Sequence, residues 1–485
     1  MRAVTKPLKF AIVVGSRQFF NGEPAIVVRQ QVLAQLESLG IEPFILPLEA
    51  TENGAVQSRA DAALYGDFFR PRRDEIDGMV ILLPNFGDEI AIVETVRRAS
   101  LGVPILLQAS NDEINKVDVH SRRDAFCGKI SVANNFQQYG IPFTDTTSHT
   151  VDVESDEFLE DLRAFSRVCR TVRGLKRARI GAIGARTSAF HTMRYSEKLL
   201  QASGITVVTA DMSEIIGAAE ALSPDAPEVR AKLEEISAYG KIPSTILRDN
   251  IVKQARLSIV IDRWIEENEC DASSIQCWRS IQDNFGCATC LTMSMIGEKL
   301  MPSACEVDVM GAISMYALAL ASQMPSAILD WNNNYGAHQD MCVCTHCGNF
   351  PKSFIGETPE ISNLDVLGTV IGPDKCFGAV KGKVKAGPMT FFRISSDDGQ
   401  GRLKAYVGEG EFTDDPFPMD GGIAVTKVRR LRALLSFIVR NGFEHHVGMV
   451  RGRHASIVEE AVRRYLGWPI YRHEAPEDQI RPVVL

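Results

Sequence analysis

Short apolar runs alternate with amphipathic stretches along the first third of the chain. Helical periodicity covers 24–39 and 89–100, and strand-like runs lie at 10–14 (FAIVV), 43–48, 79–84 and 103–108. Alternation of strands and helices is typical of a parallel sheet that is covered by helices on both faces. We therefore predict a doubly wound α/β domain over residues 1–172.

The same alternation restarts after a charged stretch, RTVRGLKRAR (170–179). IGAIG (180–184) and ITVVTA (205–210) have the character of strands, and helical periodicity then covers about 226–300 and 308–323. A second doubly wound α/β domain is expected over 173–352. The run IGAIGAR (180–186) lacks the G-x-G-x-x-G spacing of a dinucleotide site, and a tight strand-to-helix turn explains it at least as well.

Beyond Lys352 the pattern changes to short alternating segments such as MTFFRIS and RLKAYVGEGEF, punctuated by Gly and Pro. Such segments are typical of antiparallel strands in a small barrel or sandwich. A helix at about 454–466 is expected to close the chain. The predicted fold class is therefore α/β, with two Rossmann-like domains followed by a β-rich C-terminal domain over 353–485.

Length and charge narrow the possible functions. A chain of 485 residues is expected to form two to four domains. The formal charge of −8, without long runs of one sign, argues against a nucleic-acid partner. The N-terminal run FAIVVGS lacks the features of a signal peptide, and no apolar run approaches the roughly 20 residues of a membrane span. A cytoplasmic protein without a membrane partner is expected.

The chain has eleven cysteines, which we expect to be reduced thiols. One group could form a structural zinc site with His346, although its C-x-C-x-x-C spacing differs from a paired C-x-x-C framework. This group consists of Cys342, Cys344 and Cys347, with Cys287 and Cys290 upstream.

Two acidic segments are candidates for chemistry. In SACEVDVMG (303–311), Glu306 and Asp308 interrupt a small and apolar stretch, so a carboxylate there either caps a helix or lies in a cleft. Further along, AIL (327–329) gives way to DWNNNYG, which predicts that a strand ends at Asp330. A carboxylate at a strand end often faces the ligand crevice, but an Asx turn gives the same pattern.

The segment EHHVGMVRGRH (444–454) adds His445, His446 and His454. Successive strand residues point to opposite faces, so His445 and His446 cannot both face one site. Two carboxylates and one imidazole suit a hard or borderline divalent cation such as Mn²⁺ or Mg²⁺, with positions left open for substrate oxygens. A metal-dependent hydrolase or aldolase could use the same ligands.

Four segments, ACEVDVMGA, LDWNNNYG, CTHCGNF and HHVGMVRGRH, resemble the active-site segments of the L-fucose isomerase and L-arabinose isomerase superfamily. The predicted domain order resembles that superfamily as well. The resemblance implies an aldose–ketose isomerase that works through a cis-enediolate. It implies that Glu306 and Asp330 are both acid/base groups and metal ligands, that His446 is the third ligand, and that the ion is Mn²⁺, with Mg²⁺ or Co²⁺ as alternatives.

The resemblance also implies substrate contacts. It points to Gln276 and Trp278, in a stretch that matches only loosely, and to His346 as a fourth ligand or a substrate contact. Arg17 aligns with the region through which a neighbouring subunit reaches the site, which implies a homo-oligomer, with a hexamer favoured. A solvated loop arginine explains Arg17 equally well.

The substrate is left open. Arg451 and Arg453, with Lys352, could recognise a sulfonate, phosphate or carboxylate on the sugar, but exposed charges on a strand give the same pattern. The expected substrate is a pentose, a 6-deoxyhexose or a 6-substituted hexose. The rival functions are a sugar-binding protein without chemistry and a metal-dependent aldolase or hydrolase.

Overall fold

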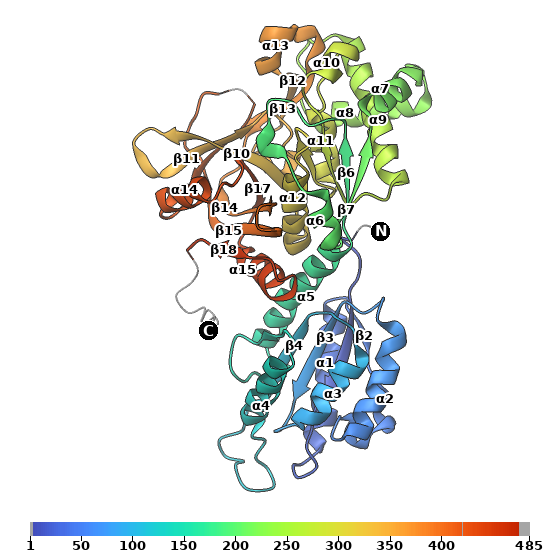
Figure 1. The fold of residues 1–485 in the computed structure, drawn as a ribbon, viewed down its shortest axis with the longest axis vertical. Coiled ribbons are helices and arrows are strands. Elements are labelled where there is room, and N and C mark those ends of the chain that lie inside the picture. The colour runs from blue at the N-terminus through green and yellow to red at the C-terminus, as the bar shows by residue number, and fades with distance from the viewer. Residues whose placement is uncertain (1–2, 420, 475–485) are drawn as a thin grey trace. The chain divides into compact units, whose positions relative to one another are not determined.

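The computed structural model describes residues 3–419 and 421–474, and the chain forms two compact units. The first holds residues 5–173 and 460–467, and the second holds 174–459 with the remaining described residues. Figure 1 shows the chain coloured from its N-terminus to its C-terminus. Among the described residues, no helix has the length and apolar character needed to cross a membrane.

The first unit is built on five parallel strands in the order β2-β1-β3-β4-β5. Alternate residues of β1 enter two different cores: Phe10 and Ile12 pack with α1 and α5, whereas Ala11 and Val13 pack with α2, α3 and α4. Helices on both faces confirm the predicted doubly wound arrangement. The elements are β1 (Lys9–Val14), α1 (Glu23–Ser38), β2 (Glu42–Phe44), α2 (Arg59–Phe69), β3 (Gly78–Leu83), α3 (Glu89–Ala99), β4 (Ile105–Ala109), α4 (Ala125–Gln138), β5 (Thr144–Asp145) and α5 (Asp156–Lys176).

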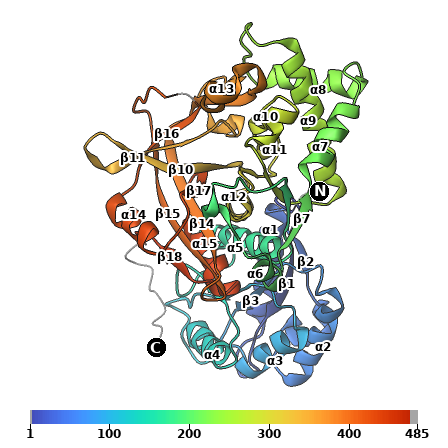
Figure 2. The same cartoon turned by 45° about the horizontal axis from the view of Figure 1, so that its top comes forward.

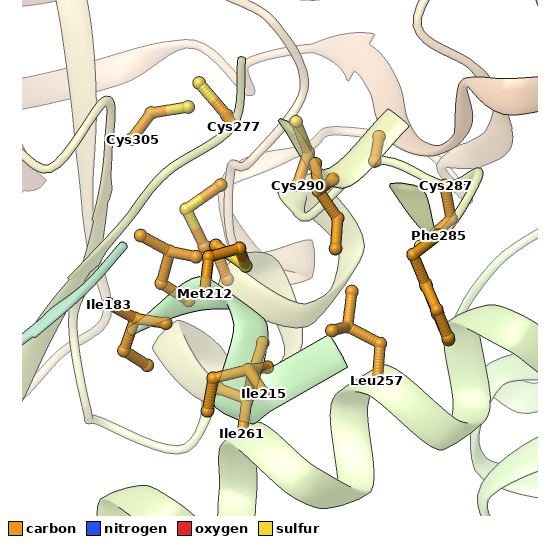
Figure 3. Packing of buried hydrophobic residues seen from close by; sticks show 14 of the residues in the cluster. Ile183, Met212, Ile215, Leu257, Ile261, Cys277, Phe285, Cys287, Cys290 and Cys305 are labelled. Atoms are coloured by element: carbon orange, nitrogen blue, oxygen red, sulfur yellow. The ribbon is translucent and has the colours of Figure 1, made fainter. Parts of the chain in front are cut away.

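The second unit begins with four parallel strands in the order β7-β6-β8-β9, packed on a core that Figure 3 shows from close by. Strand β8 falls inside a stretch for which helical periodicity was predicted, and there the prediction is wrong. Its sequence, ASSI, is fully buried but contains no apolar run that would reveal a strand. The elements are β6 (Arg179–Ile183), α6 (Glu197–Ala202), β7 (Thr206–Ala210), α7 (Met212–Ala221), α8 (Pro227–Tyr239), α9 (Arg248–Glu267), β8 (Ala272–Ile275), α10 (Ser280–Asn284), α11 (Cys290–Glu298) and β9 (Ser303–Cys305).

The remaining strands form one mixed sheet whose central part closes on itself. Strands β16, β11, β10, β17, β14 and β15 pair in that order, and β15 pairs back to β16, so these six make an antiparallel barrel. This confirms the predicted β-rich domain with a small barrel. Its strands are β10 (Ser326–Tyr335), β11 (His338–His346), β14 (Gly387–Asp397), β15 (Arg402–Thr413), β16 (Gly422–Lys427) and β17 (His446–Arg451).

Three further strands and three helices surround the barrel. They are β12 (Glu360–Asn363), α13 (Asp365–Ile371), β13 (Phe377–Lys383), α14 (Leu431–Arg440), α15 (Ala455–Glu459) and β18 (Ile470–Arg472). The predicted closing helix is the short α15, which continues as a π-helical stretch over Glu460–Tyr465. Strands β10 and β11 precede residue 352 and pair within the barrel, while the domain boundaries predicted at 172 and 352 stay predictions.

Helix α12 (Val309–Ser322) lies between the four-stranded sheet and the barrel (Figures 1 and 2). All of its residues are buried, as expected of a helix that is apolar around its whole circumference. Asp308 caps its N-terminus, because one carboxylate oxygen accepts a hydrogen bond from the backbone N–H of Gly311 at 2.8 Å. The helix therefore fixes residues 303–308 beside the barrel strands.

The cap leaves no room for a side chain at Gly311. A Cβ atom there would lie 2.3 Å from a carboxylate oxygen of Asp308. We expect Gly311→Ala to lower the free energy of unfolding by about 2 kcal/mol or more in urea denaturation. The control is Gly217→Ala on the exposed face of α7, where nothing lies within 4 Å and alanine is expected to add about 0.5–1 kcal/mol. A Gly311→Ala protein as stable as this control would contradict the assignment of Asp308 as the cap of α12.

Candidate active site

The imidazole of His446, the first residue of β17, is the centre of a buried polar cluster. Its Nε2 atom lies 3.5 Å from a carboxylate oxygen of Glu306 and 3.4 Å from one of Asp330. The Nε2 atom of His346 lies 3.4 Å away. Asp330 pairs in register with His446 on one side and with Thr345 on the other, so three neighbouring barrel strands bring Asp330, His346 and His446 together, and the turn before α12 adds Glu306. The structure thus brings together four residues that the sequence singled out.

Asp330 does not end a strand, so that prediction is wrong. It lies near the middle of β10, which continues to Tyr335 and pairs with β11 across two irregularities in register. The polar residues that follow Asp330 are exposed on the outer part of the β10–β11 hairpin. An antiparallel hairpin keeps its backbone hydrogen bonds without an apolar face, so the loss of hydrophobicity did not mark the strand end.

Glu306 occupies the turn between β9 and α12, where Asp308 and not Glu306 caps the helix. Glu306 and Val307 both have left-handed backbone conformations, with φ of 62° and 55°. Such conformations are strained, especially for a β-branched residue, and cost of order 1–3 kcal/mol each. The backbone N–H of Asp308 donates to the carbonyl of Cys305 at 3.0 Å and closes this turn. The strain is located at the residue whose carboxylate faces His446.

A buried charge network orients His446. Its Nδ1–H donates to Asp308 at 2.8 Å, and two guanidinium nitrogens of Arg393 donate to the same carboxylate at 2.6 and 3.0 Å. Arg393 also donates to Glu444 at 3.1 Å, and the Ser395 hydroxyl donates to Glu444 at 2.8 Å. Burial acts to lower the pKa of His446, but its hydrogen bond to Asp308 and the charges of Asp330 and Glu306 outweigh burial and raise it. In its neutral form, with the proton on Nδ1, His446 presents the lone pair of Nε2 to the cluster.

Arg393 and Glu444 were not identified from the sequence as parts of the site. The signal was present in MTFFRIS, where Arg393 interrupts an apolar strand. Its side chain is fully buried, and a buried guanidinium requires buried carboxylates as partners.

The two carboxylates that face His446 differ electrostatically from Asp308. Burial raises the pKa of Glu306 to about 7 and the pKa of Asp330 to about 6. Burial acts in the same direction on Asp308, but Arg393 and His446 outweigh it and hold the pKa of Asp308 well below its ordinary value. Glu306 and Asp330 are therefore poised to exchange protons near neutral pH, whereas Asp308 stays ionised.

Neutral thiols contribute to the apolar surroundings of Glu306. Cys277 and Cys305 meet at the edge of the core shown in Figure 3, and Glu306 directly follows Cys305. Cys290 and Cys347 also lie close to Glu306. Burial raises the pKa of the Cys277 thiol to about 12, so this group adds no charge at neutral pH.

His346 and His445 flank the cluster in different ways. His346 is buried, and its Nδ1 accepts from the backbone N–H of Cys347 at 2.9 Å, so its proton lies on Nε2 and points to His446. This arrangement makes His346 a hydrogen-bond donor. The side chain of His445 is 43% exposed, its Nε2 lies 3.9 Å from Asp330, and its ring contacts Phe190 edge-on.

The donor set fits a divalent cation. Glu306 Oε2 and Asp330 Oδ1 are buried, and no described residue donates a hydrogen bond to either. Buried carboxylate oxygens without partners are costly unless a cation compensates them. Glu306, His346 and His446 have nitrogen or oxygen atoms within 4.8 Å of one another, as do Asp330, His445 and His446. The prediction that His445 and His446 cannot both face one site is therefore wrong, because β17 begins at His446 and its alternation does not extend to His445. A hard or borderline ion would be held by Glu306, Asp330 and His446.

The hypothetical zinc site does not assemble. Cys342 and Cys344 lie in the barrel core, with their sulfur atoms 3.8 Å apart and next to the Thr426 hydroxyl. Cys347 packs instead against the core that contains Cys290. Cys342 and Cys344 are two residues apart in β11 and therefore point to the same face of the strand. Cys347 follows the end of β11 and points to a different core. In the described part of the chain, no cysteine belongs to a group that could hold a metal ion.

Gln276 and Arg17, which were predicted to contact substrate, have polar partners of their own, whereas the buried Nε1–H of Trp278 has no hydrogen-bond partner among the described residues. Gln276 donates to the Trp278 carbonyl and accepts from the Ala185 backbone, and Trp278 packs edge-on against Phe190, the neighbour of His445. Arg17 belongs to the first unit, where it pairs with Glu89.

The three predicted anion-binding cations are also engaged. Lys352 donates to a backbone carbonyl and lies over the Tyr239 ring. Arg451 donates to the carbonyls of residues 385 and 386, and Arg453 pairs with Glu409. The structure therefore does not bring these cations to the His446 cluster.

Comparison with known families agrees with this geometry. The fucose/sulfoquinovose isomerase N-terminal domain matches residues 11–176, and the L-fucose isomerase C-terminal domain matches residues 344–473. Together they cover more than half of the chain. The chain belongs to the L-fucose isomerase-like family. This confirms the resemblance seen in the sequence, and the protein is an aldose–ketose isomerase.

Curated relatives extend the similarity to most of the chain. A sulfoquinovose isomerase of Priestia megaterium is 25% identical over 443 residues, which are 90% of this chain and 89% of the relative. A sulfoquinovose isomerase of Alkalicoccus urumqiensis is 28% identical over 326 residues, which are 65% of this chain and 69% of the relative. A third, from Clostridium sp. strain MSTE9, is 24% identical over 336 residues.

The first prediction for the isomerase concerns the Asp308–Arg393 pair. Removing one partner of a buried ion pair leaves an uncompensated charge, so we expect Arg393→Met to lower the free energy of unfolding by about 3–5 kcal/mol in urea denaturation. The control is Arg453→Met, which removes an exposed pair with Glu409 and should change stability by less than about 0.5 kcal/mol. Equal stability of the two variants would show that the network does not hold the site together.

A second prediction concerns pH. The folded-state pKa values of Glu306 and Asp330, about 7 and about 6, exceed their ordinary values of 4.5 and 3.8. The folded protein therefore binds these protons more tightly than the unfolded chain. The stability that they contribute is fully present below about pH 4 and is lost as pH rises through about 6–7.

The side chain introduced by Glu306→Gln cannot ionise, so this variant should keep part of the stability that wild type loses as the pH rises. In chelator-treated protein we expect the stability of the variant relative to wild type to be about 1–3 kcal/mol greater at about pH 8 than at about pH 5. Urea denaturation at the two pH values measures the difference. A difference of zero or of opposite sign would mean that Glu306 is not held in a desolvating environment.

Proposed function

We propose that the isomerase interconverts sulfoquinovose, a glucose derivative with a sulfonate at C6, and the corresponding 2-ketose in a metal-dependent reaction. The observation that carries the mechanism is the position of His446 Nε2, within 3.5 Å of two unpartnered carboxylate oxygens with raised pKa values. The names of the relatives, one of them matched along 90% of this chain, support the substrate.

The reaction moves one proton between C1 and C2 and another between the two oxygens. Without an ion, burial raises the pKa of Glu306 to about 7 and that of Asp330 to about 6, so each carboxylate can hold or release a proton in the buried site. In our proposal one of them removes the carbon-bound proton and returns it to the neighbouring carbon, the other assists the proton transfer between the two oxygens, and the roles exchange in the reverse direction. We propose that the Nε2–H of His346 donates to a substrate oxygen.

Glu306, Asp330 and the Nε2 of His446 would hold the divalent ion. When bound, such an ion supplies Lewis-acid polarisation of the carbonyl and makes the neighbouring carbon more acidic. Asp308 keeps the His446 lone pair directed at that position through the Nδ1–H hydrogen bond. The identity of the ion as Mn²⁺, the homo-oligomeric assembly and the cytoplasmic location stay predictions.

The proposal is tested by proton NMR of sulfoquinovose in D₂O with enzyme and Mn²⁺. We expect the ketose to form with deuterium at C1 or C2, the carbon chain to stay intact, and the reaction to stop when a chelator removes the ion. Cleavage of the carbon chain would instead identify an aldolase. Binding without exchange would identify a sugar-binding protein.

Variants test the proposed roles of the two carboxylates. We expect Glu306→Gln and Asp330→Asn to fold and to lose turnover by about 10²–10⁴-fold each, because each variant lacks one proton-transfer group. Glu37→Gln, on the exposed face of α1, provides a control substitution of the same chemistry. Turnover close to wild type in either site variant would remove that carboxylate from the mechanism.

A further inference from the structure

A pocket of about 220 Å³ opens beside the His446 cluster. One part of its lining comes from β10 and β11 and includes Asp330 and His346. Another part comes from the start of α13 and from β13, and includes Asp365 and Lys381. The pocket therefore places a charged pair in the same cavity as two residues of the proposed site.

Lys381 carries the only full positive charge among the described residues that line this pocket. Its side chain is 16% exposed, and the one described partner of its ammonium group is the carboxylate of Asp365. A lysine ammonium has three N–H donors, so donors remain for a ligand. Asp365 is 50% exposed, which allows its carboxylate to be hydrated when it leaves the pair.

An anionic substrate needs such a group. Asp330 and Asp365 both contribute negative charge to the pocket, and a sulfonate placed between them without a cation would be repelled. The cations expected from the sequence do not line this pocket, because Lys352 and Arg451 donate to backbone carbonyls elsewhere.

We propose that Lys381 binds the sulfonate of the substrate in this pocket, and that Asp365 is a counter-ion which the sulfonate displaces. The inference rests on the proposed function, because it assigns a residue to the anionic substituent of that substrate. If it is correct, the two partners of this ion pair have opposite effects on the affinity for substrate. Lys381 favours the anionic sugar, whereas Asp365 competes with it.

The opposite effects on KM expected of substitutions at Lys381 and Asp365 provide the test, which uses steady-state kinetics with sulfoquinovose. We expect Lys381→Met to raise KM about 10–100-fold with kcat changed less than about three-fold, because a charge-assisted hydrogen bond to the ground state is lost. Lys381→Arg should restore part of this affinity. Asp365→Asn should lower KM by about two- to five-fold, because it removes the competing carboxylate.

Two controls separate recognition from structure. Lys385→Met removes an exposed lysine four residues further along that does not line the pocket, and it should leave KM unchanged. The uncharged 6-deoxy analogue, measured as a substrate or as a competitive inhibitor, should bind wild type and Lys381→Met equally.

The proposal is overturned if Lys381→Met and Asp365→Asn raise KM together, as expected of a purely structural pair, or if Lys381→Met weakens the uncharged analogue to the same degree. An unchanged KM in Lys381→Met would also overturn the proposal. Failure of the proposed function is distinguishable from these results, because wild type itself would then not convert sulfoquinovose.

Discussion

The carboxylate of Asp308 is the group on which the rest of the site depends. It caps α12 through Gly311, binds the guanidinium of Arg393 on β14, and accepts the Nδ1–H of His446 on β17. It therefore ties the central helix to two barrel strands at one buried point. Because the carboxylate is fully desolvated, each bond that it makes matters more than it would in water.

Two carboxylates separated by one residue have opposite electrostatic roles. Asp308 accepts several hydrogen bonds and stays ionised, whereas no described residue donates a hydrogen bond to the buried Oε2 of Glu306, and burial raises the pKa of Glu306 to about 7. The environment, and not the residue type, sets this difference. The strained turn at 306 and 307 is closed by the backbone hydrogen bond from Asp308 to Cys305, and it leads directly into the cap that the Asp308 carboxylate provides.

Periodicity predicted the doubly wound domains and the β-rich domain because apolar runs and repeats report burial, as at Phe10–Val14 in β1. It failed at β8, which is buried but consists of ASSI, and at β10, which continues through exposed asparagines beyond Asp330. The motifs led to Glu306, Asp330 and His446, which the fold brings together. The roles of Arg393 and of the Lys381–Asp365 pair could not be identified from the sequence. The partner of Arg393, Asp308, is distant in sequence, and Lys381 and Asp365 become neighbours only when β13 and α13 pack.

The proposed ion site is tested by locating Mn²⁺ in crystals of the isomerase from anomalous scattering at the manganese absorption edge. We predict one strong peak at bonding distance from Glu306, Asp330 and the Nε2 atom of His446, and its loss in crystals of His446→Ala. A protein that isomerises sulfoquinovose while its Mn²⁺ lies elsewhere, or while this position stays free of any ion, would contradict the proposed site.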